Sequence, residues 1–236
     1  MRTFKNTVGN SFFQKLKGGN KELNYGCEIV QKWTVESGHR KIIDLGYAEG
    51  VDLLNIKNHS KMKNIELHGV DFRSEKEYGK VMKGIVHHQC LLESEKLSFE
   101  NEEFDYIICY DILEHIFDYI PLLKELHRIV KKDAIIEIKV PHYTYSRAYV
   151  DPTHIRYFAM ELFYFFVKGS SRAYYFDFSF NKIESIHLSF QKSNVLFYNR
   201  WVEKFINKSE RHYLFYEKSF LAGLVPAENI LVKLRK

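Results

Sequence analysis

Residues 104–142 carry the sequence FDYIICYDILEHIFDYIPLLKELHRIVKKDAIIEIKVPH. Two almost uninterrupted apolar runs, 104–111 and 134–140, have the length of buried strands, and Pro141 ends the second. Between them, Pro121 occupies a position that the first turn of a helix tolerates. The apolar residues behind it follow the i, i+1, i+4, i+7, i+8 spacing of one helix face: Leu122, Leu123, Leu126, Ile129 and Val130. This stretch therefore predicts a strand–helix–strand unit.

The same alternation continues on both sides of this unit. Strands are predicted at 42–43, 65–72, 84–88 and 180–190, a last apolar segment at 230–234, and helices within 11–37, 51–57, 75–83 and 160–167. Strands that alternate with helices indicate a mostly parallel sheet covered on both faces, an α/β doubly wound, Rossmann-like fold. A length of 236 residues suits a single domain over 1–236. Within it we expect a helical segment at 1–38 and insertions at 141–178 and 191–226.

Composition and charge narrow the class of protein. The formal net charge is +5, and lysine and arginine are spread along the chain without a basic arm, so nucleic acid is not the expected partner. The three cysteines, Cys27, Cys90 and Cys109, lie far apart, which excludes a disulfide framework and a CxxC zinc site and fits a cytoplasmic location. No apolar run reaches the roughly 18 residues of a membrane span. We expect a monomer or a homodimer.

A glycine-containing turn, DLGYAEG (44–50), follows the first predicted strand. In an open parallel sheet the ligand crevice lies at the carboxyl ends of the strands, and glycines let a ligand approach the backbone closely. The turn has G-x-x-x-G spacing rather than the G-x-G-x-x-G that holds a pyrophosphate, and Asp44 suits a cationic amino group better than a phosphate. Asp71 follows the second strand, where a carboxylate accepts hydrogen bonds from ribose hydroxyls. The pattern favours a nucleoside that carries a positively charged amino acid over a dinucleotide.

Three stretches, DLGYAEG, GVDF and 104–142, resemble successive motifs of the class I S-adenosylmethionine-dependent methyltransferases. The resemblance covers residues 40–142, and the fourth strand with the LEH that follows it is more specific than the glycine turn. The resemblance implies a seven-stranded sheet in the order 3-2-1-4-5-7-6 with an antiparallel last strand, and it places the last two strands at 180–190 and 229–235. It also implies S-adenosylmethionine as cofactor and S-adenosylhomocysteine as product.

The resemblance further implies which residues hold the cofactor. The methionine part would lie along the glycine turn, the ribose on Asp71 and the adenine against Phe72. Tyr110 and Asp111 would lie under the sulfonium. After the third strand, relatives often place an acid for the adenine amino group, whereas this chain has Gln-Cys-Leu-Leu at 89–92, so that contact is left open. The full predicted set is Asp44, Gly46, Tyr47, Ala48, Gly50, Asp71, Phe72, Cys90, Leu91, Tyr110 and Asp111.

Transfer of a methyl group to a hydroxyl needs a base for the hydroxyl proton, and imidazole suits this role near neutral pH. The candidate bases are three histidines at or beyond the ends of the fourth and fifth strands: His115, His142 and His154. His154 is the main candidate, because DPTHIRYF (151–158) packs an acid, an imidazole and a guanidinium into a few positions. The alternative is that Asp151 caps a following helix and that His154 donates to a backbone carbonyl.

Two further stretches, VPHYTYSRAYVDPTHIRYFAMELFYFF and the C-terminal YEKSFLAGLVPAENILVKLRK, resemble a subgroup of small methyltransferases associated with polysaccharide and surface-glycan biosynthesis. This resemblance implies O-methylation of a sugar, a glycan or another small molecule, with the two insertions as a cap or lid on the acceptor side. The predicted substrate-binding residues are Tyr143, Tyr145, Asp151, Arg156 and Tyr157. No H-x-x-E-H motif or Asp-rich cluster occurs, so no metal site is predicted.

Two alternatives stay open. The acceptor is a tRNA or a protein if the separated basic residues within 191–226 form a basic face; these are Arg200, Lys204, Lys208, Arg211 and Lys218. The non-enzyme alternative is a degenerate methyltransferase fold that only binds a partner. The two acids and two glycines at the expected cofactor positions argue against this alternative, because a fold freed from ligand binding need not keep them.

Overall fold

The computed structural model describes residues 40–59, 64–74, 84–93 and 96–236. The helical segment expected at 1–38 and the helix expected at 75–83 lie outside the described residues. Across the described part of the chain, no helix is both long and apolar enough to cross a membrane.

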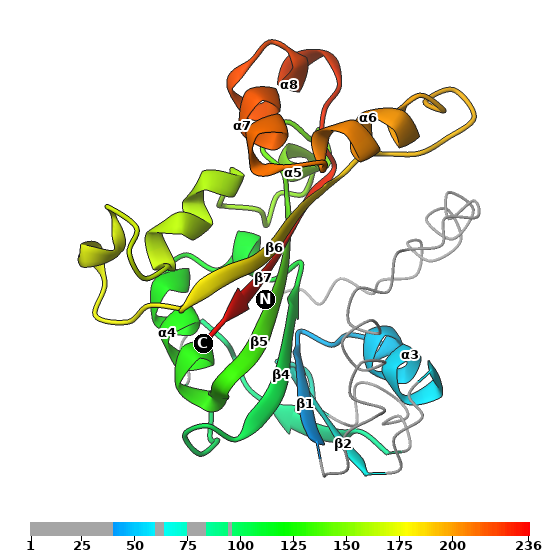
Figure 1. Cartoon of the computed structure of the whole chain (residues 1–236). Coiled ribbons are helices and arrows are strands. Elements are labelled where there is room, and N and C mark those ends of the chain that lie inside the picture. The colour runs from blue at the N-terminus through cyan, green and yellow to red at the C-terminus, as the bar shows by residue number, and fades with distance from the viewer. Residues whose placement is uncertain (1–39, 60–63, 75–83, 94–95) are drawn as a thin grey trace.

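A seven-stranded sheet in the order β3-β2-β1-β4-β5-β7-β6 forms the centre of the fold (Figure 1). Its strands are β1 (Arg40–Leu45), β2 (Ile65–Asp71), β3 (Val86–Gln89), β4 (Phe104–Tyr110), β5 (Val130–Pro141), β6 (Lys182–Ser189) and β7 (Asn229–Arg235). β7 pairs antiparallel with both β5 and β6, whereas the other neighbours pair parallel. The strand order, the antiparallel last strand and the position of the last two strands confirm the predictions.

Strand register brings the carboxyl ends of four strands to one edge. Leu45 of β1 is level with Val70 of β2 and with Cys109 of β4. Tyr110 of β4 is in turn level with Lys139 of β5. The turns that follow β1, β2 and β4 therefore meet at this edge, where a parallel sheet offers its ligand crevice.

Both faces of the sheet are buried, which explains why its central strands are almost wholly apolar. On one face Ile43 and Ile107 pack in a core that includes the helix α4 (Tyr119–Ile129). On the other face Ile42 and Ile108 pack in a core that includes the helix α3 (Val51–His59). Alternate residues of one strand thus face different helices.

α4 begins where the sequence indicates. The carboxylate of Asp118 accepts a hydrogen bond from the backbone N–H of Ile120 at 3.2 Å, which caps the helix. Pro121 lies in the first turn, whose N–H groups have no partner within the helix, so its missing N–H costs little.

Several elements differ from the prediction in their bounds or type, among them β3, β5 and the helix expected at 160–167. β3 starts at Val86 rather than at Gly84, because Gly84 has a left-handed backbone with φ of +90°. β5 starts at Val130, directly after α4, and Val130 pairs with Phe104. The helix expected at 160–167 is the 3₁₀ helix η3 (Met160–Phe166), in which every third residue is buried: Met160, Phe163 and Phe166. That spacing matches the three-residue turn of a 3₁₀ helix.

The remaining helices lie in the loops at the carboxyl edge or in the two insertions. They are η2 (Leu113–His115), α5 (Arg147–Val150), η4 (Ala173–Tyr175), α6 (Asn199–Ile206), α7 (Glu210–Lys218) and α8 (Leu221–Leu224). α5, α6, α7 and α8 gather beyond the end of the sheet at which β5 finishes (Figure 1). We call these four helices the cap.

Candidate functional site

The turn after β1 has an alternating left-handed backbone. Gly46, Ala48 and Gly50 have φ of +69°, +43° and +66°. A Cβ at Gly46 would lie 2.0 Å from Cδ1 of Ile112, so both the conformation and the space exclude a side chain there. The N–H of Gly46 donates to the carbonyl of Val70 at 2.8 Å, which ties the turn to β2.

Asp44 lies at the end of β1 and is only 3% exposed. Burial, followed by the negative charge of Asp52, raises the pKa of its carboxyl well above the ordinary value, and Lys139 offsets this only in part. A cationic group bound beside Asp44 would restore the charged carboxylate.

Tyr47 packs inside the fold and does not face the turn's outer side. Its hydroxyl pairs with Nδ1 of His87 at 2.8 Å, and a Cβ at Gly69 would lie 2.5 Å from its ring. Tyr47 therefore holds the turn on β2 and β3, a structural role that does not support its predicted contact with the cofactor.

Asp71, at the end of β2, forms a bidentate ion pair with Arg73. Oδ1 accepts from Nε of Arg73 at 3.0 Å, and Oδ2 accepts from the terminal NH2 group at 3.1 Å. Oδ1 also accepts from the backbone N–H of Arg73 at 3.0 Å. Phe72 is 65% exposed and Leu91 50% exposed, while Cys90 is buried and its N–H donates to the carbonyl of Asp71.

Tyr110 is the last residue of β4, and Asp111 follows it. The hydroxyl of Tyr110 donates to Oε1 of the fully buried Glu137 at 2.7 Å. Nζ of Lys139 lies 4.8 Å from the centre of the Tyr110 ring and 2.8 Å from Oδ2 of Asp111. Asp111, with φ of +54° and a half-exposed side chain, turns the chain outward at the edge of the sheet.

Glu114, His115 and His154 come together beyond β4, although 39 positions separate His115 from His154 in the sequence. The two imidazole rings meet edge to face with centroids 4.7 Å apart. The N–H groups of Ile155 and Arg156 donate to the carbonyl of Glu114 at 2.9 and 3.3 Å, and these bonds dock the segment that carries His154 on η2.

The carboxyl of Glu114 is buried among these groups. The residue is 1% exposed, and among the described residues neither of its carboxylate oxygens has a hydrogen-bond partner. Burial, followed by the charge of Asp111, raises the pKa of Glu114 to about 8. Burial, followed by the neighbouring His154, lowers the pKa of His115, so His115 is neutral at pH 7.

His154 is held by the chain just before it. Its Nδ1 lies 3.2 Å from the carbonyl oxygen of Ala148, and its Nε2 lies 3.9 Å from Oδ2 of Asp151. Asp151 caps a turn through Thr153 rather than a helix, because its Oδ1 accepts from the N–H of Thr153 at 2.9 Å and from its hydroxyl at 2.6 Å. The contact with a backbone carbonyl that a purely structural role of His154 predicts is thus present. This contact occupies Nδ1, so Nε2 can still act on a substrate.

His142 is enclosed rather than open to a substrate. It is fully buried, Nδ1 lies 2.7 Å from the hydroxyl of Thr144, and Nε2 lies 3.1 Å from Oε1 of Glu217 on α7. This placement argues against the predicted role of His142 as a base. The residue joins the end of β5 to the cap.

Three of the predicted substrate-binding side chains are engaged within the protein. The hydroxyls of Tyr143 and Tyr145 donate to the carbonyl of Glu217 at 3.3 Å and to Oε1 of Glu228 at 3.2 Å. The guanidinium of Arg156 donates to the carbonyl of Phe117. Their contacts indicate structural roles, and the predicted contact with a substrate stays a prediction.

Tyr157, in contrast, is available at the surface. It is 51% exposed and stacks on Tyr149, which is 55% exposed, with ring centroids 4.5 Å apart and an interplanar angle of 25°. Tyr157 lies three residues after His154 in the sequence, within the segment docked on η2.

Comparison with known proteins identifies the family. Residues 13–203 match the methyltransferase domain family, so the chain belongs to it, and S-adenosylmethionine is its cofactor. No curated protein sequence matches the chain significantly.

Several solved structures share the fold. A S-adenosylmethionine-dependent methyltransferase from Archaeoglobus fulgidus has 18% identity and a TM-score of 0.58, with 95% of this chain and 98% of that one covered. The phosphoethanolamine N-methyltransferase 2 of Haemonchus contortus, in complex with S-adenosylmethionine, has 16% identity and a TM-score of 0.52, with 89% of this chain and 52% of that one covered. The [4+2]-cyclase SpnF has 16% identity and a TM-score of 0.52, with coverage of 90% and 81%. The fold alone therefore does not fix the reaction.

The carboxyl edge fits this cofactor in three respects. The buried carboxyl of Asp44 suits the ammonium of the methionine part, and Gly46 and Gly50 supply the left-handed backbone that the turn beside it needs. Asp71 suits the ribose. The exposed side chains of Phe72 and Leu91, which follow β2 and β3, offer apolar surface to the adenine.

Sequence reasoning missed two residues at this edge. Arg73 follows Asp71 by two positions, and its ion pair with that acid had no sequence signal beyond opposite charge. Glu114 had one: it is an acid inside the otherwise apolar run Ile112–Ile116, next to His115. An acid in such a run is either buried or placed at a site, and Glu114 is buried.

Proposed function

We propose that this methyltransferase transfers its methyl group to a hydroxyl of a sugar, a glycan or another small molecule. The observation that carries the proposal is the imidazole pair His115–His154 at the carboxyl end of β4, on the same edge of the sheet as Asp44 and Asp71. A hydroxyl acceptor must lose its proton as the new bond forms, and a neutral imidazole at this edge is suited to remove it.

His154 is the proposed base. The carbonyl of Ala148 can only accept, so the neutral ring carries its hydrogen on Nδ1 and its lone pair on Nε2. The bound cofactor supplies an electrophilic methyl group. The residues of this chain hold the acceptor oxygen in line with that group and take its proton, and such positioning is the main source of rate in a displacement of this kind.

The stacked pair Tyr149–Tyr157 supports a sugar as the acceptor. Both rings are exposed, Tyr157 belongs to the segment that carries His154, and the hydroxyl of Tyr149 donates to the carbonyl of Tyr143 at 2.8 Å. An exposed aromatic face of fixed orientation is a surface on which the C–H face of a sugar ring packs. The resemblance of the stretch 140–166 to glycan-associated methyltransferases agrees with this choice.

His154→Ala tests the proposed base. We expect methyl transfer from labelled S-adenosylmethionine to sugar hydroxyls to fall by about 100-fold or more, the usual contribution of a general base. Calorimetric affinity for the cofactor should stay within about twofold, because His154 lies beyond the cofactor residues. His212→Ala is the matched control, because it removes an imidazole of α7 that is hydrogen-bonded to the hydroxyl of Ser209. A parallel loss of turnover and cofactor affinity would contradict a role in proton removal.

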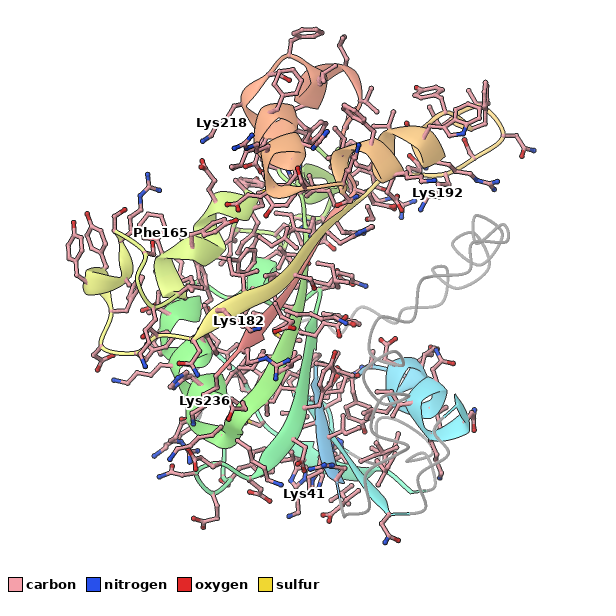
Figure 2. All side chains as sticks on the ribbon, in the orientation of Figure 1. Lys41, Phe165, Lys182, Lys192, Lys218 and Lys236 are labelled. Atoms are coloured by element: carbon pink, nitrogen blue, oxygen red, sulfur yellow. The ribbon has the colours of Figure 1, made fainter. Side chains whose placement is uncertain are left out.

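A macromolecular acceptor is the second candidate. Arg200, Lys204 and Lys208, on and just after α6, are exposed between exposed aromatic side chains of the same segment: Phe197, Trp201 and Phe205. Figure 2 labels Lys192, before α6, and Lys218, at the end of α7, on the same cap. Binding of RNA that weakens steeply with salt would favour this candidate over a sugar.

A further inference from the structure

The carboxyl group of Glu114 is enclosed at a position where its charged form is costly. Both of its oxygens are buried and without a partner among the described residues, and the residue is 1% exposed. A buried carboxylate normally costs several kcal/mol unless it is paired or binds a metal, so a cation at this position would remove the penalty.

Two imidazoles supply the remaining donors. One ligand atom each from Glu114, His115 and His154 can be chosen so that all three lie within 4.8 Å of one another. Bonds of about 2.1 Å to a tetrahedral ion place ligand atoms about 3.4 Å apart. Side-chain rotations that move each ligand atom by about 1 Å would therefore bring the three atoms to the distances that an ion requires. The three residues come from η2 and from the loop after α5, which the backbone bonds between Glu114 and 155–156 hold together.

The outer contacts of the imidazoles orient their lone pairs. Nδ1 of His154 faces the carbonyl of Ala148, and Nδ1 of His115 lies 2.9 Å from the hydroxyl of Thr153. Because that hydroxyl donates to Asp151 at 2.6 Å, it accepts from His115, and Nε2 of each ring then carries the lone pair. Chains of the form carboxylate–hydroxyl–imidazole fix the tautomer of metal-binding histidines.

The charges around the cluster also favour a cation. Asp151 lies next to His154, and Asp111 lies close enough to Glu114 to raise the pKa of its carboxyl. Lys139, a basic group that acts on Glu114, is itself paired with Asp111 at 2.8 Å. Asp111 and Asp151 are therefore negative charges beside the cluster that would attract a cation.

We propose that Glu114, His115 and His154 bind one divalent transition-metal ion that holds the acceptor hydroxyl. Two imidazoles and one carboxylate are a donor set for zinc, manganese, iron or cobalt, whereas magnesium and calcium prefer oxygen alone. Three protein ligands leave positions open for a water or a substrate oxygen. The proposal rests on O-methylation only for the role of the ion, since its binding is measured without any acceptor.

With the ion present, His154 is a ligand and the ion replaces it as the group that promotes loss of the proton. The acceptor hydroxyl coordinates the ion, which lowers its pKa, and its proton passes to water. The oxygen then forms a bond to the methyl carbon as the carbon–sulfur bond breaks, and the electron pair of that bond stays on sulfur.

Direct binding of metal tests the site. After treatment with a chelator, the full chain should bind one equivalent of Zn²⁺ or Mn²⁺ in calorimetry, and Co²⁺ should give visible absorption typical of mixed nitrogen and oxygen ligands. Glu114→Gln keeps the volume of the side chain, and it should weaken Zn²⁺ binding by at least about tenfold, as should His154→Ala. His212→Ala should bind as the wild type does.

Thermal unfolding of each variant without metal shows whether weaker metal binding reflects loss of a ligand or loss of the fold. If His154→Ala does not fold, the metal affinity of Glu114→Gln alone tests the site. An ion held with unchanged affinity by Glu114→Gln sits elsewhere and overturns the proposal, as does failure of the wild type to bind. Sugar methylation that proceeds at the same rate with and without metal would overturn the ion's role while leaving the proposed O-methylation intact.

Discussion

Asp71 combines a structural contact with its predicted role in cofactor binding, and the two can be separated. Its carboxylate holds Arg73 through two hydrogen bonds from the guanidinium and one from the backbone N–H. Asp71→Asn keeps the shape of the side chain but removes the charge and one acceptor. Because a hydrogen bond to a charged group contributes about 1.5–3 kcal/mol, we expect affinity for S-adenosylmethionine to fall by about 10- to 100-fold in calorimetry.

The matched control for this change is Asp177→Asn. Asp177 is an exposed acid that pairs with Lys124 on α4, away from the carboxyl edge, and it loses the same charge. Its cofactor affinity should equal that of the wild type. Unchanged affinity of Asp71→Asn would show that the cofactor's ribose does not use this carboxylate.

From the sequence alone, the residues that could be placed at the site are those whose position depends on neighbours along the chain. Asp44, Gly46 and Asp71 directly end strands or follow them, so their place at the carboxyl edge followed from the strand pattern. The pairing of His115 with His154 could not be predicted, because it depends on how the loop after β5 folds back on η2. For the same reason the burial of His142 against Glu217 was hidden, since α7 lies 75 positions further along the chain.

Among the strands, β4 owes part of its attachment to one acid at its start. Asp105 is 5% exposed and accepts hydrogen bonds from Arg40 at 3.0 Å, from the N–H of Lys41 at 2.9 Å and from Lys131 at 2.8 Å. These donors come from β1 and β5, so Asp105 joins three strands at the edge opposite the site. Burial alone would raise the pKa of Asp105, but the hydrogen bonds outweigh it and the pKa is lowered.

Asp105→Asn should therefore lower the free energy of unfolding by about 1–3 kcal/mol at pH 7, as measured by urea denaturation. A carboxyl whose pKa is lower in the folded state stabilises fully above its unfolded pKa, and this stabilisation is lost as the pH falls through the folded value. The gap between wild type and variant should be constant from pH 8 to 5 and narrow only below about pH 4. A gap that already narrows between pH 7 and 5 would contradict the assigned cause.

Helices and strands of the sheet were predictable to the extent that burial alone determines them. β1, β2, β4 and β5 carry buried apolar residues on both faces, which leaves short, mostly apolar runs such as Ile107–Cys109 in the sequence. α5–α8 lacked such a signal. α6, for example, buries the polar side chains of Asn199 and Glu203 and exposes the aromatic side chains of Trp201 and Phe205. Its apolar residues therefore do not mark its buried face. Its contacts are polar: Glu203 accepts from the N–H of Phe190 at 3.0 Å and from Lys192 at 2.7 Å.

On the scale of the whole molecule, one carboxylate joins the cap to the sheet. Oε1 of Glu217 on α7 accepts from the N–H of Met160 at 2.9 Å and lies 3.1 Å from Nε2 of His142 at the end of β5. Around it, the hydroxyl of Tyr164 donates to Glu210 at 2.8 Å, and Lys218 pairs with Glu161 at 2.8 Å. These contacts link the two insertions to each other.

Glu217→Ala tests whether the cap and the sheet unfold as one unit. The change leaves the N–H of Met160 and the ring of His142 buried without their acceptor, at an expected cost of about 2–4 kcal/mol. Since the central strands share none of these bonds, hydrogen–deuterium exchange should rise in α7, α8 and η3 while β1 and β4 stay protected. Cofactor affinity should then persist while methyl transfer falls, because acceptor-side residues such as His154 lie in the loop between His142 and Met160.

The control variant is Lys218→Ala, which removes only an exposed ion pair and should change neither hydrogen–deuterium exchange nor methyl transfer. Equal loss of protection in the cap and in the central strands would instead show a single cooperative unit, in which acceptor and cofactor binding cannot be uncoupled.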